Sequence, residues 1–117
     1  MPVRFGVAGT AYWAQEIHVG GLKSQPRVEL VGLWGRDGEA ARRIADAAGV
    51  RVFATFDEML SAVDAVSIAV APDAQPALAR AAAIAGKHLL LEKPLALSVA
   101  AAAPVADAIA GARVAAI

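Results

Sequence analysis

Short, strongly apolar runs alternate along the chain with longer segments that are amphipathic or rich in alanine. Glycine, proline or charged residues bound these runs, and most of the runs have almost no polar face. Such runs are typical of strands in a parallel sheet that helices cover on both sides. The pattern predicts strands at Val3–Ala8, Val28–Trp34, Arg51–Ala54, Ala65–Val70 and His88–Leu91, and the beginning of a sixth strand at Arg113–Ile117.

The segments between these runs predict helices. Asp37 and Ser98 each stand directly before such a segment, where a capping side chain accepts a hydrogen bond from a free backbone N–H. Pro104 lies inside the last segment and is expected to kink its helix. The predicted helices are Tyr12–Ser24, a helix from the Asp37 cap to Ala48 ended by Gly49, one turn from Asp57 to Leu60, Asp73–Ala85 ended by Gly86, and a helix from the Ser98 cap to Ala110 ended by Gly111.

Strands and helices that alternate over such short connections require a parallel sheet with right-handed crossovers. The predicted fold class is therefore α/β, a Rossmann-type doubly wound parallel sheet with strand order 3-2-1-4-5-6. A length of 117 residues corresponds to one domain, and 58% hydrophobic residues are enough to fill its core. We therefore expect residues 1–117 to form a single domain.

Charge and cysteine content exclude several classes of function. The chain has 11 Lys and Arg against 11 Asp and Glu, and the resulting zero net charge argues against binding DNA or RNA, which needs a basic excess. Without cysteine there are no disulfides, thiolate nucleophiles or cysteine-based zinc sites. The two histidines, His18 and His88, are far apart in sequence, so we expect no metal site. The function must depend on backbone geometry and a few charged side chains.

No segment is expected to cross a membrane. The most apolar stretch, Leu95–Ile117, contains Pro104, Asp107 and Arg113, and its commonest residue is alanine, a weak hydrophobe. The apolar run at the N-terminus is too brief for a signal peptide and suits a buried first strand better. We therefore expect a cytoplasmic protein.

The first predicted strand runs directly into Gly9-Thr10-Ala11-Tyr12-Trp13-Ala14, at the start of the first helix. In dinucleotide-binding folds, the three glycines of this turn allow a tight bend, make room for the pyrophosphate and let helix and strand approach. Gly9 holds the first position and Ala14 is tolerated at the third, but the methyl group of Ala11 points where the pyrophosphate would pass. An ordinary strand–helix turn is the alternative, although the position in the chain favours phosphate binding.

The second predicted strand ends in Gly35-Arg36-Asp37, where dinucleotide-binding folds place the residues that select the cofactor. Gly35 stands where an acidic residue usually binds the adenosine ribose. Arg36 follows it, and a guanidinium that stacks on adenine and pairs with a 2′-phosphate favours NADP over NAD. The alternative is that Arg36 is a solvated loop residue and Asp37 only a helix cap. For Asp37 we expect capping to be the larger role.

The segment Gly86-Lys87-His88-Leu89-Leu90-Leu91-Glu92-Lys93-Pro94 resembles the G-K-H-x-x-x-E-K-P signature of the Gfo/Idh/MocA oxidoreductases, the family of glucose-fructose oxidoreductase and inositol dehydrogenase. Residues 9–18 resemble the family's G-T-G-Y-W-A opening, and residues 26–37 resemble its second strand and cofactor-selecting turn. Residues 56–66 are similar to its short helix and fourth strand. The resemblance therefore extends over essentially the whole chain in the family's order.

The resemblance implies a role for each matching residue. Glu92 would hydrogen-bond the nicotinamide ribose, and Lys93, the implied catalytic residue, would reach the nicotinamide and polarise a substrate hydroxyl during hydride transfer. The Lys93–Pro94 peptide bond would be cis, which directs Lys93 into the cleft. The alternative for Glu92 and Lys93 is a surface ion pair. The implied cofactor-binding residues are Gly9, Thr10, Ala11, Tyr12, Trp13 and Ala14 around the pyrophosphate, Arg36 and Asp37 beside the adenosine ribose, Ala71 and Pro72 along the nicotinamide, and Gln75, Glu92, Lys93 and Pro94.

Several features depart from the family's pattern. Gln75 occupies a position where His is usual, and it can hydrogen-bond but cannot exchange protons near neutral pH. His88 is expected to be structural, and His18 has no partner visible in the sequence. Family enzymes continue into a second α/β domain with the substrate pocket and an Asp-x-x-x-His pair. Because this chain stops where the sixth strand begins, we expect that C-terminal substrate domain to be absent and the 117 residues alone to be inactive, whether they are a fragment of a longer enzyme or a free-standing cofactor-binding domain.

The main hypothesis is the dinucleotide-binding domain of an NAD(P)-dependent oxidoreductase that acts on a sugar, cyclitol or related hydroxyl-bearing substrate by hydride transfer. Its expected partner is a nicotinamide dinucleotide, NADP or NAD. The alternative is a non-catalytic NAD(P)-binding or dimerisation module. A methyltransferase-like domain is a weaker third hypothesis, because Gly35 supplies no acidic residue for a ribose. An unpaired sheet edge seeks a partner, so we also expect a homo-oligomer.

Overall fold

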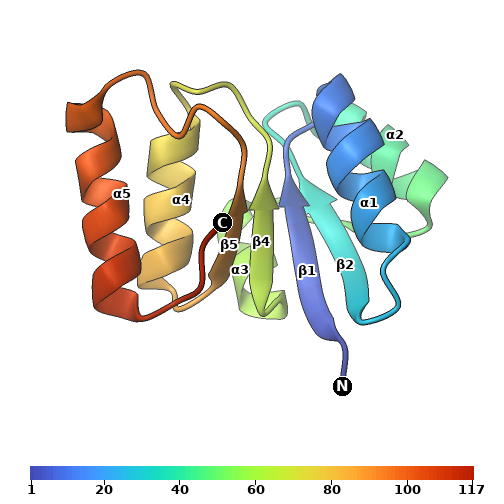
Figure 1. Cartoon of the computed structure of the whole chain (residues 1–117). Coiled ribbons are helices and arrows are strands. Elements are labelled where there is room, and N and C mark those ends of the chain that lie inside the picture. Colours follow the sequence, from blue (N-terminus) through green and yellow to red (C-terminus); the bar gives the residue numbers. More distant parts are fainter.

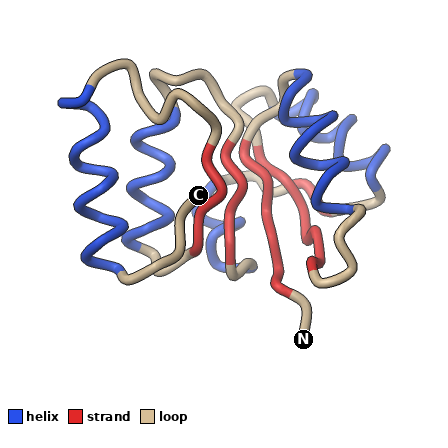
Figure 2. The backbone as a smooth tube through the Cα atoms, in the orientation of Figure 1, coloured by secondary structure: helices blue, strands red, loops and turns tan.

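Five parallel strands form one sheet in the computed structural model, which describes residues 1–117 (Figure 1). The strand order is β3-β2-β1-β4-β5, and every neighbouring pair is parallel. The tube in Figure 2 shows the strands side by side with helices on either side of them. The predicted α/β doubly wound fold and the order of its first five strands are confirmed. The strands are β1 (Val3–Ala8), β2 (Val28–Trp34), β3 (Arg51–Val52), β4 (Ala65–Ile68) and β5 (His88–Leu91).

The sixth predicted strand is present only as a short pairing beside β5. Leu89 and Ala116 form an isolated parallel bridge. Residues 113–117 therefore lie where the sixth strand of the predicted order belongs, but they form no strand of their own. His88 has the structural role expected of it, because its Nδ1 accepts a hydrogen bond of 3.0 Å from the N–H of Ala115 and holds this segment in place.

Two predicted helix caps are confirmed by side-chain hydrogen bonds. Asp37 Oδ1 accepts from the N–H of Ala40 over 3.1 Å. Ser98 Oγ accepts in the same way from the N–H of Ala101 over 3.1 Å. Gly49 ends its helix in the left-handed conformation, with a φ of 69°. The helical elements are the π-helix η1 (Ala14–Val19) and the α-helices α1 (Gly20–Lys23), α2 (Gly38–Ala48), α3 (Phe56–Ala62), α4 (Gln75–Ile84) and α5 (Val99–Ala112).

Helix α3 is longer than the single turn that the sequence predicted. It begins at Phe56 rather than at Asp57, because Thr55 Oγ1 accepts a hydrogen bond of 3.1 Å from the N–H of Glu58 and caps the helix. It then continues to Ala62, since its apolar side is buried against the sheet. Burial that depends on the rest of the fold thus lengthened a helix whose local signal is short.

The first and last helices also differ from the prediction. The segment Tyr12–Ser24 is not one α-helix, because η1 is wound as a π-helix before α1 begins. Helix α5 continues through Pro104 and Gly111, and Arg113 instead of Gly111 takes the left-handed turn, with a φ of 57°. No helix in the chain combines the length and the apolar character that a membrane span requires.

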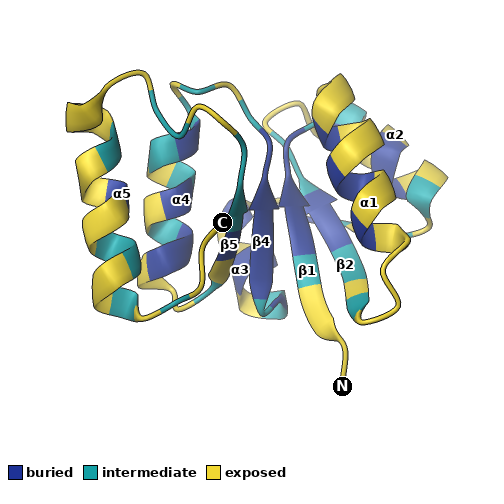
Figure 3. Ribbon diagram, in the orientation of Figure 1, coloured by how far each residue is buried: buried dark blue, intermediate teal, exposed yellow.

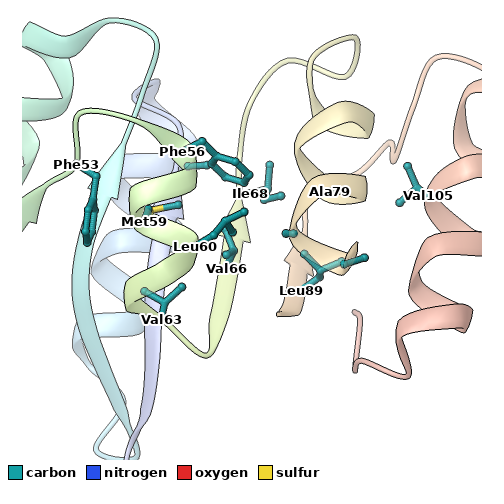
Figure 4. Close-up of a cluster of buried hydrophobic side chains, with 13 residues drawn as sticks. Phe53, Phe56, Met59, Leu60, Val63, Val66, Ile68, Ala79, Leu89 and Val105 are labelled. Carbon is teal, nitrogen blue, oxygen red and sulfur yellow. The ribbon is translucent and has the colours of Figure 1, made fainter. Parts of the chain in front are cut away.

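Helices cover both faces of the sheet. Helices α1 and α2 pack against one face of β1 and β2, whereas α3, α4 and α5 contribute to the core on the other face (Figure 3). Val7 and its neighbour Ala8 belong to opposite clusters, because successive residues of a strand point to opposite faces. The larger cluster, part of which Figure 4 labels, comprises Ala8, Phe53, Phe56, Met59, Leu60, Val63, Val66, Ile68, Ala79, Ala82, Ala83, Leu89 and Val105.

Candidate functional site

A cleft of about 710 Å³ lies where the strand order reverses between β1 and β4. Because both strands end there, the segments that follow β1, β2, β4 and β5 meet at one edge of the sheet. Open α/β sheets bind their ligands at this kind of position. The lining includes ten predicted cofactor-binding residues, namely Gly9, Thr10, Ala11, Trp13, Arg36, Asp37, Ala71, Pro72, Glu92 and Lys93, and also Trp34, Gly35, Ala69, Val70 and Leu78.

The loop after β1 is shaped by Gly9. Its φ is 132°, and a Cβ at this position would collide with the carbonyl oxygen of Ala69, so only glycine fits. The N–H of Gly9 donates to the carbonyl of Trp34 over 2.9 Å, whereas the N–H groups of Thr10 and Ala11 make no hydrogen bond within the chain. Both residues line the cleft. The loop therefore offers backbone donors that can bind an anion such as a pyrophosphate.

Four predicted cofactor-binding residues do not line the cleft. Ala14 is fully buried, which suits the close helix–strand packing expected of the third position in the motif. Tyr12 is 73% exposed and stands outside the lining. Pro94 also lies outside it, and the Lys93–Pro94 peptide bond is cis, as predicted. The fourth residue, Gln75, is buried and is not part of the lining.

Gln75 holds the loop that follows β5. Its side chain is buried, with 1% exposed. The Nε2 amide donates to the carbonyl of Glu92 over 2.8 Å and to the carbonyls of Pro94 and Leu95 over 3.2 Å each. Its Oε1 accepts from the N–H of Glu92 over 3.1 Å. The polar atoms of Gln75 are therefore hydrogen-bonded to the backbone of residues 92–95, the loop that includes Glu92 and Lys93.

At the end of β2, Gly35 leaves no space for a longer side chain. A Cβ there would collide with Cγ2 of Thr10, so the acidic residue usual at this position would displace the Thr10 side chain. Arg36 makes no hydrogen bond or ion pair within the chain, and it lines both the cleft and an adjoining hollow of about 910 Å³. Asp37 is engaged as the cap of α2, which confirms the larger role expected of it.

The carboxylate of Glu92 is the most extensively bonded group at the cleft. Its Oε1 accepts from the indole Nε1–H of Trp13 over 2.6 Å and from Nε2 of His18 over 2.8 Å. Its Oε2 accepts from the N–H of Lys93 over 3.1 Å. The hydrogen bond from His18 is the main cause that lowers the pKa of Glu92 below its ordinary value, the Lys93 N–H and the Trp13 indole act in the same direction, and burial opposes them. Glu92 is therefore ionised at neutral pH.

Lys93 is not held by a carboxylate. The guanidinium of Arg4 pairs with the carboxylate of Asp64, the imidazole of His18 contacts that of Glu92, and neither contact involves Lys93. The surface ion pair considered as the alternative for Glu92 and Lys93 is therefore absent. An unpaired ammonium at the cleft is suited to donate a hydrogen bond to a bound molecule.

Sequence reasoning missed the contribution of His18. His18 contacts Glu92, which lies 74 positions later in the sequence, and Ser67, which lies 49 positions later. Trp13 and His18 are five residues apart, a spacing that points in different directions on an α-helix. They converge on one oxygen of Glu92 because η1 has the wider turn of a π-helix. Only the histidine itself, next to an apolar helix face, could have suggested a buried polar contact.

The sequence matches a family model over residues 3–116, described as GFO_IDH_MocA, oxidoreductase family, NAD-binding Rossmann fold. The uncharacterized oxidoreductase ORF334 of Rhizobium meliloti is 40% identical over 100 residues, which cover 83% of this chain and 30% of that protein. Galactose 1-dehydrogenase of Pseudomonas fluorescens is 33% identical over 96 residues, which cover 80% of this chain and 29% of that enzyme. The chain thus spans about 30% of the length of the first of these curated relatives.

A solved structure shows the same arrangement. Biliverdin reductase from Synechocystis sp. PCC 6803, in complex with biliverdin and NADP⁺, superimposes on 99% of this chain with a TM-score of 0.90 and 32% sequence identity. The chain covers 37% of that protein. The likeness therefore concerns one part of a longer relative.

Proposed function

The chain belongs to the Gfo/Idh/MocA oxidoreductase family, and from that premise we propose that its cleft binds NADP or NAD for hydride transfer. We further propose that the substrate is a sugar, a cyclitol or a related hydroxyl-bearing molecule. A sugar substrate is supported by the similarity to galactose 1-dehydrogenase, an enzyme named for a sugar. Biliverdin reductase, another similar protein, is named for a substrate of a different class, so turnover of sugars and cyclitols by the full-length protein is the test of this part of the proposal.

The observation that carries the proposal is the convergence of three kinds of group on one cleft at the reversal of the sheet. Unbonded N–H groups follow β1, an ionised carboxylate follows β5, and an unpaired ammonium stands beside that carboxylate. A dinucleotide presents a pyrophosphate, ribose hydroxyls and a reacting ring. The N–H groups suit the pyrophosphate, the carboxylate suits the ribose hydroxyls, and the ammonium suits the region of the reacting ring. The turn that brings these N–H groups to the cleft requires glycine at position 9, because a Cβ there would collide with the carbonyl oxygen of Ala69.

Each group then has a proposed task. The N–H groups of Thr10 and Ala11 hold the pyrophosphate. Glu92 accepts a hydrogen bond from a hydroxyl of the nicotinamide ribose, because a carboxylate has more acceptor positions than its partners here occupy. Lys93 donates a hydrogen bond to the substrate oxygen and polarises it. The bound nicotinamide supplies the hydride acceptor or donor, which no side chain can provide.

We propose a preference for NADP on the basis of Arg36. Its guanidinium has no partner in the chain and borders the hollow next to the cleft, where an adenosine 2′-phosphate would lie. Titration calorimetry with NADPH and with NADH tests this. Arg36→Ala should weaken NADPH binding by about tenfold or more and change NADH binding little. Arg80→Ala, which removes an exposed arginine of α4 outside the cleft, is the matched control.

A non-catalytic module is the second candidate function. It is supported by Gln75, which stands where the family usually has a histidine and whose polar atoms are hydrogen-bonded to the backbone. Lys93 is therefore the one lysine or histidine that lines the cleft. Absence of binding of both nucleotides to the folded chain would favour a dimerisation module and overturn the first proposal. Binding without turnover of any hydroxyl-bearing substrate would favour a dinucleotide-binding module.

We also propose that the chain forms a homo-oligomer. Large apolar side chains are exposed on the side of the fold that carries β5 and α5, with Ile117 at 88%, Val99 at 87% and Leu97 at 72%. Exposed apolar surface and an incompletely paired edge both favour self-association. Light scattering at increasing concentration tests this, and a constant monomer mass up to high concentration would exclude it.

A further inference from the structure

His18 is a buried polar residue to which the proposed function assigns no role. Its side chain is 5% exposed, and it stands on η1 behind the carboxylate that faces the cleft. Nε2 lies 2.8 Å from Glu92 Oε1, and Nδ1 is hydrogen-bonded to Oγ of Ser67. Ser67 is fully buried in β4 and has no other side-chain hydrogen bond. Three elements, η1, β4 and the loop after β5, thus meet at one imidazole.

The partners determine which ring nitrogen carries the proton. An ionised Glu92 can only accept, so Nε2 must donate to it. The Ser67 hydroxyl then donates to Nδ1, which keeps an unshared pair of electrons. A neutral imidazole with its proton on Nε2 therefore satisfies both contacts, and no buried side-chain polar atom in the chain is left without a partner. A protonated ring would also take Nδ1–H to Ser67 and leave the hydroxyl hydrogen without an acceptor.

We propose that His18 is a positioning residue, which holds the Glu92 carboxylate on the side of Trp13 and thereby leaves the Lys93 ammonium free to face a ligand. This inference rests on the proposed function of the cleft. Glu92 and Lys93 are adjacent in sequence, and a flexible carboxylate next to an ammonium would otherwise tend to pair with it. In the structure Oε1 is occupied by His18 and Trp13, and Lys93 has no ion-pair partner.

The π-helix is what allows this arrangement. Trp13 and His18 reach the same carboxylate oxygen from one side of the first helix, over 2.6 Å and 2.8 Å. Two donors on one oxygen orient a carboxylate more strictly than one donor does, because each restricts a different rotation of the side chain. Ser67 in turn prevents the imidazole from turning, since it fixes the other nitrogen. The geometry is a relay of three side chains in which only Glu92 faces the cleft.

Nuclear magnetic resonance of the ¹⁵N-labelled 117-residue chain tests the relay without any ligand. The nitrogen resonances of His18 should show a proton on Nε2, which donates to Glu92, and an accepting Nδ1 that faces Ser67. The indole N–H of Trp13, identified with Trp34→Phe, should follow the titration of Glu92. In His18→Leu that titration should move to higher pH, and in His18→Gln, whose amide keeps a donor, it should stay close to the wild type. A proton on Nδ1, or a titration that His18→Leu leaves unchanged, would overturn the proposal.

Binding measurements separate positioning from mere structural support. His18→Leu should weaken NADPH binding by about tenfold, His18→Gln should restore most of that loss, and the losses in His18→Leu and Glu92→Gln should not add in the double variant. Additive losses, or no rescue by glutamine, would contradict the relay. If the wild type binds neither NADPH nor NADH, the proposed function fails, whereas the resonance experiment still decides the role of His18.

Discussion

Trp13 and Glu92 are joined by a hydrogen bond of 2.6 Å, although 79 positions separate them in the sequence. The bond links the loop after β1 to the loop after β5 at the cleft between them. It therefore ties the proposed pyrophosphate side of the cleft to the proposed nicotinamide side. Both residues line the cleft, so a change in either should be detectable as a change in ligand binding.

Trp13→Phe keeps an aromatic ring at the cleft and removes its donor to Glu92. We expect the pKa of Glu92 to rise and NADPH to bind roughly three- to tenfold more weakly, because a hydrogen bond to a charged group is lost. Calorimetry measures the affinity. Tyr12→Phe, the adjacent exposed aromatic residue outside the cleft, should leave the affinity unchanged. Equal losses in both variants would show that the indole N–H is not responsible.

Ala11→Gly should improve dinucleotide binding. The methyl group of Ala11 is exposed at the cleft beside the unbonded N–H groups, where the motif of dinucleotide-binding folds has its second glycine. We expect NADPH to bind roughly threefold more tightly or better, while the free energy of unfolding falls by up to about 1 kcal/mol. An unchanged affinity would mean that the pyrophosphate passes elsewhere.

Gln75→Leu should destabilise the fold and distort the loop that carries Glu92 and Lys93. The variant keeps the volume of the side chain but removes all four hydrogen bonds to residues 92–95. We expect the free energy of unfolding to fall by about 2–4 kcal/mol, because buried backbone groups lose their partners. Urea denaturation measures this. Gln15→Leu, at an exposed position of η1, is the control and should change stability little.

Stability should depend on pH through Asp64. Its hydrogen bond from the Arg4 guanidinium holds the pKa of Asp64 at about 2, below its ordinary value of 3.8. Because the pKa is lower in the folded state, the stabilisation is complete above the ordinary value and is lost as the pH falls toward 2. Asp64→Asn should therefore be less stable than the wild type at pH 7, and the difference should shrink between pH 4 and pH 2 in urea denaturation. Arg4→Met should show the same trend, and a difference independent of pH would contradict it.

The sequence by itself determined the features that depend on neighbouring residues. The apolar runs indicated all five strands of the sheet, and the alternation with helices predicted their order. The caps Asp37 and Ser98 were predictable because a capping oxygen meets an N–H three residues away. The segments around Gly9 and Glu92 could be assigned to one cleft, because parallel strands bring their carboxyl ends to the same edge.

Only the tertiary structure decided how the polar groups of the cleft are shared. The partners of His18 and Gln75 lie at least 17 positions away in the sequence, in β4 and in the loop after β5, and no local pattern encodes these distances. The π-helix that turns Trp13 and His18 toward one carboxylate has no signal in residue propensity, and its contacts in the folded chain select it. Burial and hydrogen bonding of this kind are properties of the assembled fold, so they decided that Glu92 is held from behind and that Lys93 remains unpaired.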